Sequence, residues 1–172
     1  MKKIIIAVSA LVLIAGTMYA AAMRTHSDRK AKFSIQYPGD WKKKTNQDGI
    51  NLMLLSKDSL ANVQVIRSDV EANTPTDAFL AEVEKSAGAQ HVNQLPADKR
   101  AAQSDDLANM NADQGSAGYY MVENDGVKIH QLIMAVRKGA VMYAIIVTFA
   151  DQGAEQYRDV STKIADSFKV LN

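Results

Sequence analysis

The chain has 172 residues, no cysteine and a formal net charge of +1. This length suits a single domain that buries most of its apolar surface without the help of disulfide bonds. A chain without cysteine has no disulfide, thiolate metal site or N-terminal lipidated cysteine. The near-zero charge argues against a general nucleic-acid binder, which would carry a clear basic excess.

Residues 1–22 have the three parts of a secretory signal peptide: Lys2 and Lys3, an apolar run over residues 4–16, and small residues at 20–22. We predict that this segment directs export and is cleaved. The alternative is an uncleaved inner-membrane anchor, because residues 4–23 approach the length that spans a bilayer. In both cases we expect the domain outside the cytoplasm, either periplasmic or secreted.

Residues 23–32 are polar and show no apolar period, which predicts a flexible tail ahead of a domain over residues 33–172. Phe33, Ile35 and Tyr37 alternate with polar residues and predict the first strand. Trp41 returns to the core after a Pro-Gly-Asp turn. Two apolar runs at 50–55 and 62–68 are separated by turn residues at 57–59, which predicts a hairpin.

A helix is predicted next, with Thr74 as N-cap, Pro75 at the first position and Asp77 as the reciprocal cap. Its buried stripe and its stop signal are formed by Phe79, Leu80, Val83, Ala87 and Gly88. Residues 89–116 give the weakest signal. Only residues 91–95 suggest a strand, and the rest favours a loop over a helix, with one short turn near 106–110. A long insertion of this kind is either mobile or functional.

The strongest secondary-structure signal lies at residues 127–149, which predict a hairpin of two long strands with its turn at 137–140. An Asp-Gly hairpin turn at 125–126 precedes them. The second strand carries two apolar sets that point to opposite faces: Val141, Tyr143, Ile145, Val147 and Phe149 on one, and Met142, Ala144 and Ile146 on the other. Such a strand must be covered on both faces.

A last helix is predicted after Asp151, which would cap it. Its apolar stripe is formed by Tyr157, Val160, Ile164, Ala165 and Phe168. Two helices and a doubly apolar sheet built from hairpins predict the α+β class. The expected architecture is a three-layer α/β/α sandwich with one helix on each face of a central, mainly antiparallel sheet.

Several short motifs occur in the same order as in a known protein family. The segment Phe33-Ser34-Ile35-Gln36-Tyr37-Pro38 followed by Trp41 resembles the F-x-I-x-Y-P-x-x-W opening of the PsbP-like family, and Asp166-Ser167-Phe168 resembles its terminal i-x-x-S-F motif. The strand motif Gly118-Tyr119-Tyr120, the turn at Asp125-Gly126 and the hairpin at Gly139 follow the order of the family. The resemblance covers about residues 33–170.

This resemblance implies an α/β/α sandwich and an extracytoplasmic protein that is an accessory or assembly factor of a larger complex, not an enzyme. The founding plant protein of the family is an extrinsic subunit of the oxygen-evolving photosystem and helps to retain calcium and chloride. Its N-terminal extension, which acts on that complex, is not recognised in this chain. A photosynthetic function is therefore not carried over, and a bacterial relative is the better interpretation.

No residue pattern predicts a catalytic, cofactor or metal site. The histidines His26, His91 and His130 do not have the spacing of a metal site, and His130 is expected at the rim of a strand. Ser116, within Gly-Ser-Ala-Gly, lacks the G-x-S-x-G order of a nucleophile elbow. The paired acids at 105–106 and 123–125 lack the spacing of a calcium loop.

Two further groups have an ordinary structural interpretation. Strand methionines commonly fill gaps in a core, which applies to Met53, Met121, Met134 and Met142. The run Trp41-Lys42-Lys43-Lys44 could contact an anionic partner or a lipid surface, but a core tryptophan followed by a solvated loop is the favoured interpretation.

The sequence favours an exported, non-catalytic binding domain that acts on a protein partner or an envelope complex. No nucleic acid is expected as a partner, and membrane contact is expected only through the N-terminal segment if it stays uncleaved. The alternative is a periplasmic carrier of a small ligand or metal ion, with its site between the sheet and residues 89–116.

Overall fold

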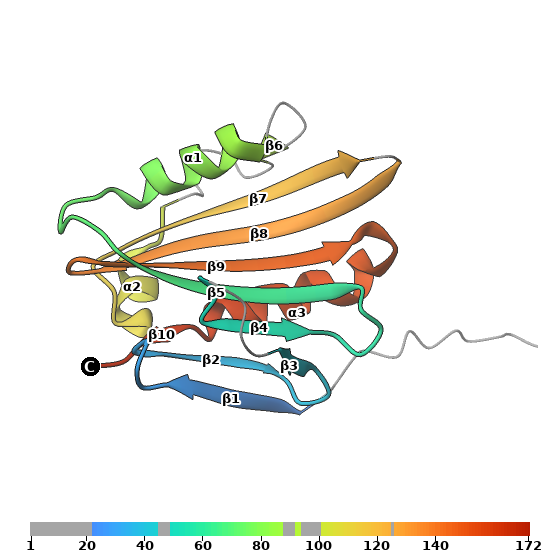
Figure 1. Cartoon of the computed structure of the whole chain (residues 1–172), viewed down its shortest axis with the longest axis horizontal. Helices are drawn as coiled ribbons and strands as arrows, with labels where there is room; N and C mark the ends of the chain where they lie inside the picture. Colours follow the sequence, from blue (N-terminus) through green and yellow to red (C-terminus); the bar gives the residue numbers. More distant parts are fainter. Residues whose placement is uncertain (1–21, 45–48, 88–91, 94–100, 125) are drawn as a thin grey trace, which may run out of the picture.

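The computed structural model describes residues 22–44, 49–87, 92–93, 101–124 and 126–172 (Figure 1). Its strands are β1 Met23–Asp28, β2 Phe33–Pro38, β3 Lys42–Lys44, β4 Leu52–Leu55, β5 Ala61–Asp69, β6 Val92–Asn93, β7 Gln114–Asn124, β8 Val127–Lys138, β9 Val141–Ala150 and β10 Lys169–Val170. Its helices are α1 Thr76–Ala87, α2 Ser104–Met110, the 3₁₀ turn η2 Asp151–Gly153, and α3 Ala154–Asp166.

Within the described residues the strands form two sheets, in which neighbouring strands pair antiparallel. The large sheet has the order β3-β4-β5-β9-β8-β7-β6, and the small sheet has the order β1-β2-β10. The β8–β9 hairpin lies at the centre of the large sheet, and its turn uses Gly139 at a φ of +57°. The predicted hairpins, the antiparallel sheet and the α+β class are confirmed.

The two apolar faces of β9 are covered by different layers, as predicted. Tyr143, Ile145 and Val147 belong to a core cluster with Tyr157 and Ile164 of α3, whereas Met142 packs in a second cluster with Leu80 of α1. The small sheet lies in the same layer as α3, and its Phe33 and Ile35 are fully buried in the larger cluster. Figure 1 shows α1 at one edge of the large sheet, with the small sheet and α3 toward the other.

Several sequence predictions are wrong in detail. The predicted flexible tail contains β1, because a polar strand pairs along the whole length of β2 through its backbone. The insertion contains α2 and the start of β7, so it is not simply a loop with one short turn. The Gln103 amide donates to the Asp106 carboxylate (3.3 Å), which supports the N-terminus of α2.

The predicted helix caps also differ. Helix α1 begins at Thr76, not directly after Thr74, because the Thr76 hydroxyl is buried against Ser116 of β7 and its amide donates to Gln114 Oε1 (3.3 Å). Asp151 opens η2 and does not cap α3; its carboxylate is directed to His130 instead. Gly88, the predicted helix stop, lies outside the described residues, although α1 does end at Ala87.

Asp58 joins the β4–β5 turn to α3. Its carboxylate accepts hydrogen bonds from Ser56 Oγ (2.7 Å), the Leu60 amide (3.0 Å) and Tyr157 Oη (2.8 Å). Burial acts to raise the pKa of Asp58, but these hydrogen bonds together hold it below its ordinary value. Burial raises the pKa of Tyr157 to about 12, so its hydroxyl stays protonated as the donor.

We therefore expect Asp58→Asn to lower the free energy of unfolding by about 1–3 kcal/mol at neutral pH. Because the pKa is depressed in the folded state, the carboxylate contributes stability above its unfolded pKa and loses it as the pH falls through its folded pKa. The difference in the free energy of unfolding between the variant and the unaltered chain should thus become smaller at acidic pH. Urea unfolding across this pH range measures it, with exposed Asp159→Asn as the control, and a gap that stays constant with pH would contradict the assignment.

Candidate functional site

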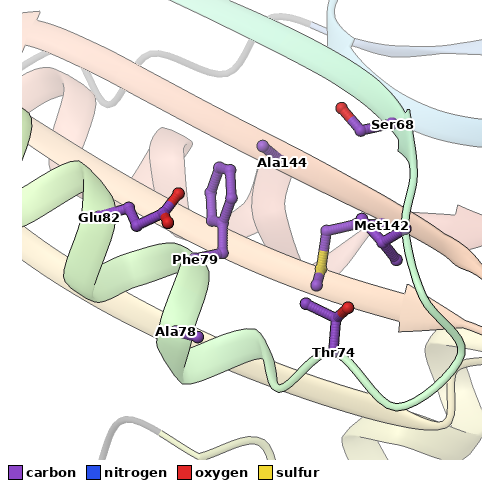
Figure 2. Close-up of a pocket in the computed structure, with 8 residues that line it drawn as sticks. Ser68, Thr74, Ala78, Phe79, Glu82, Met142 and Ala144 are labelled. Atoms are coloured by element: carbon purple, nitrogen blue, oxygen red, sulfur yellow. The ribbon is translucent and has the colours of Figure 1, made fainter.

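A pocket lies beside α1, where the helix meets β5 and β9 (Figure 2). Its volume is about 160 Å³, and most of its lining is apolar. The lining residues come from the end of β5, the segment before α1, the helix itself and β9: Ser68, Val70, Thr74, Ala78, Phe79, Glu82, Met142 and Ala144. We call it the α1 pocket.

The local sequence explains why this space stays open. Met142 and Ala144 are on the β9 face that points toward α1, and the small Ala144 side chain leaves room opposite Phe79. Phe79 is only half-buried, and Figure 2 shows its ring reaching from α1 toward β9 with the Glu82 carboxylate beside it. The pocket therefore offers an apolar floor with one acidic group at its side.

The same face of the sheet continues away from α1 over β4, β5 and β9. Helix α1 makes its main contacts with β7 and β8, and only the margin of this part of the face, at Ile146, packs against the cluster of Leu80 and Met142. Register places seven half-buried side chains side by side on it: Met53, Leu55, Asn62, Gln64, Ile66, Ile146 and Thr148. We call this set the open sheet face. It adjoins the α1 pocket, because Ile66 pairs with Ala144 in register.

His130 is buried, with 5% of its surface exposed, so the prediction of a rim position is wrong. Its ring stacks on Phe149 at a centroid distance of 5.1 Å and an interplanar angle of 14°. Nε2 lies 2.7 Å from Asp151 Oδ1, and Nδ1 lies 2.7 Å from Tyr119 Oη. Because a carboxylate only accepts, Nε2 carries the proton toward Asp151, and in the neutral ring Nδ1 accepts from the Tyr119 hydroxyl.

This histidine cluster ties β7, β8 and η2 together. The hydrogen bond from His130 is the main reason that the pKa of Asp151 lies below its ordinary value. Both ring nitrogens are engaged in these bonds, and the ring itself is enclosed. Such a histidine supports this corner of the sheet. Within the described parts of the chain, no three histidine or acidic side chains come together as metal ligands.

Ser116 has a structural environment as well. It is 2% exposed, donates a hydrogen bond to the Asp77 carboxylate and lies 2.6 Å from the Thr76 hydroxyl. Because its own proton goes to Asp77, Thr76 is the donor in the second contact. The serine thus docks the N-terminus of α1 on β7.

A second cavity of about 420 Å³ lies between α2, β7, β8 and the end of α3. We call it the α2 pocket. Its lining mixes apolar and polar side chains: Ala101, Ala102, Asp106, Asn109, Met110, Ser116, Ala117, Met134 and Asp166. Burial, and to a lesser extent the nearby Asp106, raise the pKa of Asp166. Two carboxyl groups, those of Asp106 and Asp166, therefore line the pocket beside apolar walls.

The remaining residues considered from sequence lie apart. His26 contacts Phe33 at a ring distance of 5.9 Å, and burial followed by the charge of Lys43 lowers its pKa. Met134 and Met142 are buried, as expected for core residues, whereas Met121 is 37% exposed. Asp105 and Glu123 are exposed. His91 and Asp125 lie outside the described residues.

The fold and its site define a class: a three-layer α/β/α domain with an apolar pocket beside one helix and a partly open sheet face. The family model for PsbP matches residues 21–170, and the chain belongs to the PsbP family. A comparison with curated proteins finds no match. None of the helices in the described part of the chain is long and apolar enough to cross a membrane.

Several solved structures share the fold. Cyanobacterial PsbP (CyanoP) from Synechocystis sp. PCC 6803 is 16% identical with a TM-score of 0.65, over 91% of this chain and 96% of that one. LpqN of Mycobacterium tuberculosis, described as involved in cell envelope biogenesis, is 12% identical with a TM-score of 0.62, over 92% and 97%. The Saccharomyces cerevisiae Ran-binding protein Mog1p is 9% identical with a TM-score of 0.58, over 89% and 97%.

Proposed function

We propose that this chain is an exported, non-catalytic accessory domain that binds a protein partner through the α1 pocket and the adjoining open sheet face. The main support for this proposal is that the α1 pocket and the open sheet face form one continuous surface. Apolar side chains that the fold leaves half-exposed extend from Phe79 across Ile146 and Ile66 to β4. Polar side chains such as Gln64 lie among them. A mixed surface of this kind, with exposed apolar side chains grouped together, is typical of a non-obligate protein interface.

Two further observations support this proposal. Ser116 and His130, the side chains with reactive potential, are buried and bonded to other residues of the domain, which favours a binding role over catalysis. Relatives of the same fold include a protein described as Ran-binding and one described as involved in cell envelope biogenesis. The proposal of export rests on the signal-like sequence of residues 1–22.

Photo-crosslinking tests the proposed surface in the intact chain. A photoreactive phenylalanine analogue at position 79 keeps the shape of the native ring and places the reactive group at the mouth of the α1 pocket. We expect a discrete adduct with one envelope protein. The same analogue at exposed Thr162, on the outer side of α3, should give none. Equal crosslinking at both positions, or only at position 162, would contradict the proposed surface.

The second candidate is a carrier of a small ligand or metal ion, favoured by the α2 pocket. This cavity lies between the sheet and the insertion over residues 89–116, and it brings Asp106 and Asp166 to its lining. Thermal-shift screening with calcium, manganese, zinc and copper distinguishes the two candidates, because a ligand that binds only the folded state raises the melting temperature. A shift that Asp166→Asn abolishes would favour the carrier, and no shift at millimolar metal would remove the metal-carrier option.

A further inference from the structure

One corner of the domain collects cations on two edge strands. Strand β3 is the edge of the large sheet, and all three of its residues, Lys42, Lys43 and Lys44, are exposed. Strand β1 is the edge of the small sheet, and Arg24 is exposed near its start. We call these four side chains the basic corner.

Backbone contacts bring the two edges together. The Gly39 amide donates to the Ala22 carbonyl (2.9 Å), and the Trp41 amide donates to the Pro38 carbonyl (3.0 Å), so the start of β1 lies against the turn that leads into β3. The Arg24 side chain lies over Gly39. Lys43 is close enough to His26, two residues along β1 from Arg24, to act on its charge. Figure 1 shows β3 and the start of β1 in the same region of the molecule.

The charge of this corner contrasts with that of the rest of the chain. Residues 23–172 contain 18 basic and 19 acidic side chains, which makes them nearly neutral overall. The basic corner carries four positive charges, and the acidic residues nearest to it in sequence are Asp40, in the turn between β2 and β3, and Asp28, at the end of β1. Asp58, in the turn that follows the strand paired with β3, is directed inward to Ser56 and Tyr157.

Trp41 anchors the start of β3 in the core. Its indole is 5% exposed and meets the Tyr157 ring edge-on at a centroid distance of 5.9 Å. Lysine on an edge strand also prevents pairing with other sheets, which would explain β3 by itself. The same role covers Arg24, because β1 is an edge strand as well. It does not explain why the cations of two separate sheets meet at one corner, next to Ala22, where the described chain begins.

We infer that the basic corner lies against the surface of a bilayer that contains anionic phospholipid. Clustered Lys and Arg side chains are attracted to such a surface, and this attraction acts over about one Debye length. In the sequence, the apolar run over residues 4–16 ends shortly before Arg24, so an uncleaved N-terminal segment would bring the four cations to the headgroups. The α1 pocket is formed by α1, β5 and β9, and β4 separates these strands from β3, so the pocket stays open to a partner. Leu55 and Met53 of the open sheet face lie beside Lys42 and Lys44 in register, so the basic corner borders the other end of the proposed partner surface.

The natural chain has no cysteine, so single fluorescent labels can be placed cleanly in the full chain. Thr25→Cys reports the basic corner, and Ala140→Cys reports the exposed β8–β9 turn at the opposite end of the sheets (Figure 1). The vesicles are either phosphatidylcholine alone or equal parts of phosphatidylcholine and phosphatidylglycerol, with a quencher on the lipid headgroups. We expect quenching at position 25 to exceed that at 140, to require phosphatidylglycerol and to be lost at high salt.

Lysine variants test whether the quenching depends on the basic corner or only on the net charge of the chain. The triple change Lys42→Gln, Lys43→Gln, Lys44→Gln should lose the phosphatidylglycerol-dependent quenching, and lysine-to-arginine changes at the same positions should keep it. A matched triple change at exposed Lys85, Lys128 and Lys163 should also keep it. Unaltered melting temperatures would show that these variants fold.

Three outcomes would overturn the inference. The first is equal quenching at positions 25 and 140, and the second is quenching at position 25 that is independent of phosphatidylglycerol. The third is quenching that appears only when an envelope protein extract is added, because this would assign the basic corner to an acidic protein.

Discussion

Phe168→Ala should lower the free energy of unfolding by about 3–5 kcal/mol, the largest effect that we expect from a single change. Phe168 is fully buried, and its ring lies 5.9 Å from that of Phe33 and 5.4 Å from that of Tyr143. It therefore joins the small sheet to the large one directly before β10. Urea unfolding measured by circular dichroism reports the loss.

Phe79→Ala is the matched control, since it removes the same side chain from the rim of the α1 pocket. Phe79 is half-buried and faces a cavity, so its truncation should cost clearly less than that of Phe168. Equal losses at the two positions would contradict the distinction between a core phenylalanine and a phenylalanine at a binding surface.

Gly118→Ala should destabilise the chain by about 1–3 kcal/mol or more through overpacking. The ring of Tyr120 is fully buried and lies back along β7 over Gly118. A methyl group at position 118 would come within 2.5 Å of the ring carbons Cζ and Cε2, which real side chains do not tolerate. The strand or the ring must therefore move, and thermal unfolding measures the cost.

A double-mutant cycle with Tyr120→Leu tests this explanation. If the ring is the obstacle, Gly118→Ala should cost much less in the Tyr120→Leu background, which gives a favourable coupling energy between neighbouring positions. Strictly additive losses would place the effect in the backbone of β7 instead. The Gly-Tyr-Tyr motif, which the sequence offered only as part of a family resemblance, thus has a packing reason.

The strands and helices with strong apolar periods could be predicted from sequence. Alternation along β9 gave both its faces correctly, and the spacing of Tyr157, Val160 and Ile164 gave the buried stripe of α3. Trp41 and Phe168, which carry the family motifs, are core residues. Periodicity succeeds here because burial against one neighbouring layer decides the side-chain pattern.

The predictions that failed concern features that depend on contacts between residues distant in sequence. Strand β1 has no apolar pattern, since it is held by backbone pairing with β2 at the edge of a sheet. Asp151 looked like a helix cap because its interaction with His130, 21 residues earlier, is invisible without the β8–β9 register. The α1 pocket and the open sheet face were missed for a related reason: sequence shows which residues are apolar, but not how far a helix extends over a sheet.

The central claim is that the α1 pocket and the open sheet face bind a protein partner. It is tested most directly by measuring the affinity of the purified chain for the protein that crosslinks at position 79. Gln64→Arg and Ile146→Asp place charge on the open sheet face, and Thr162→Asp places it on α3. We predict that the first two variants lose binding while still unfolding in one cooperative transition, and that the third binds like the unaltered chain. Unchanged affinity for folded Gln64→Arg and Ile146→Asp would contradict the account.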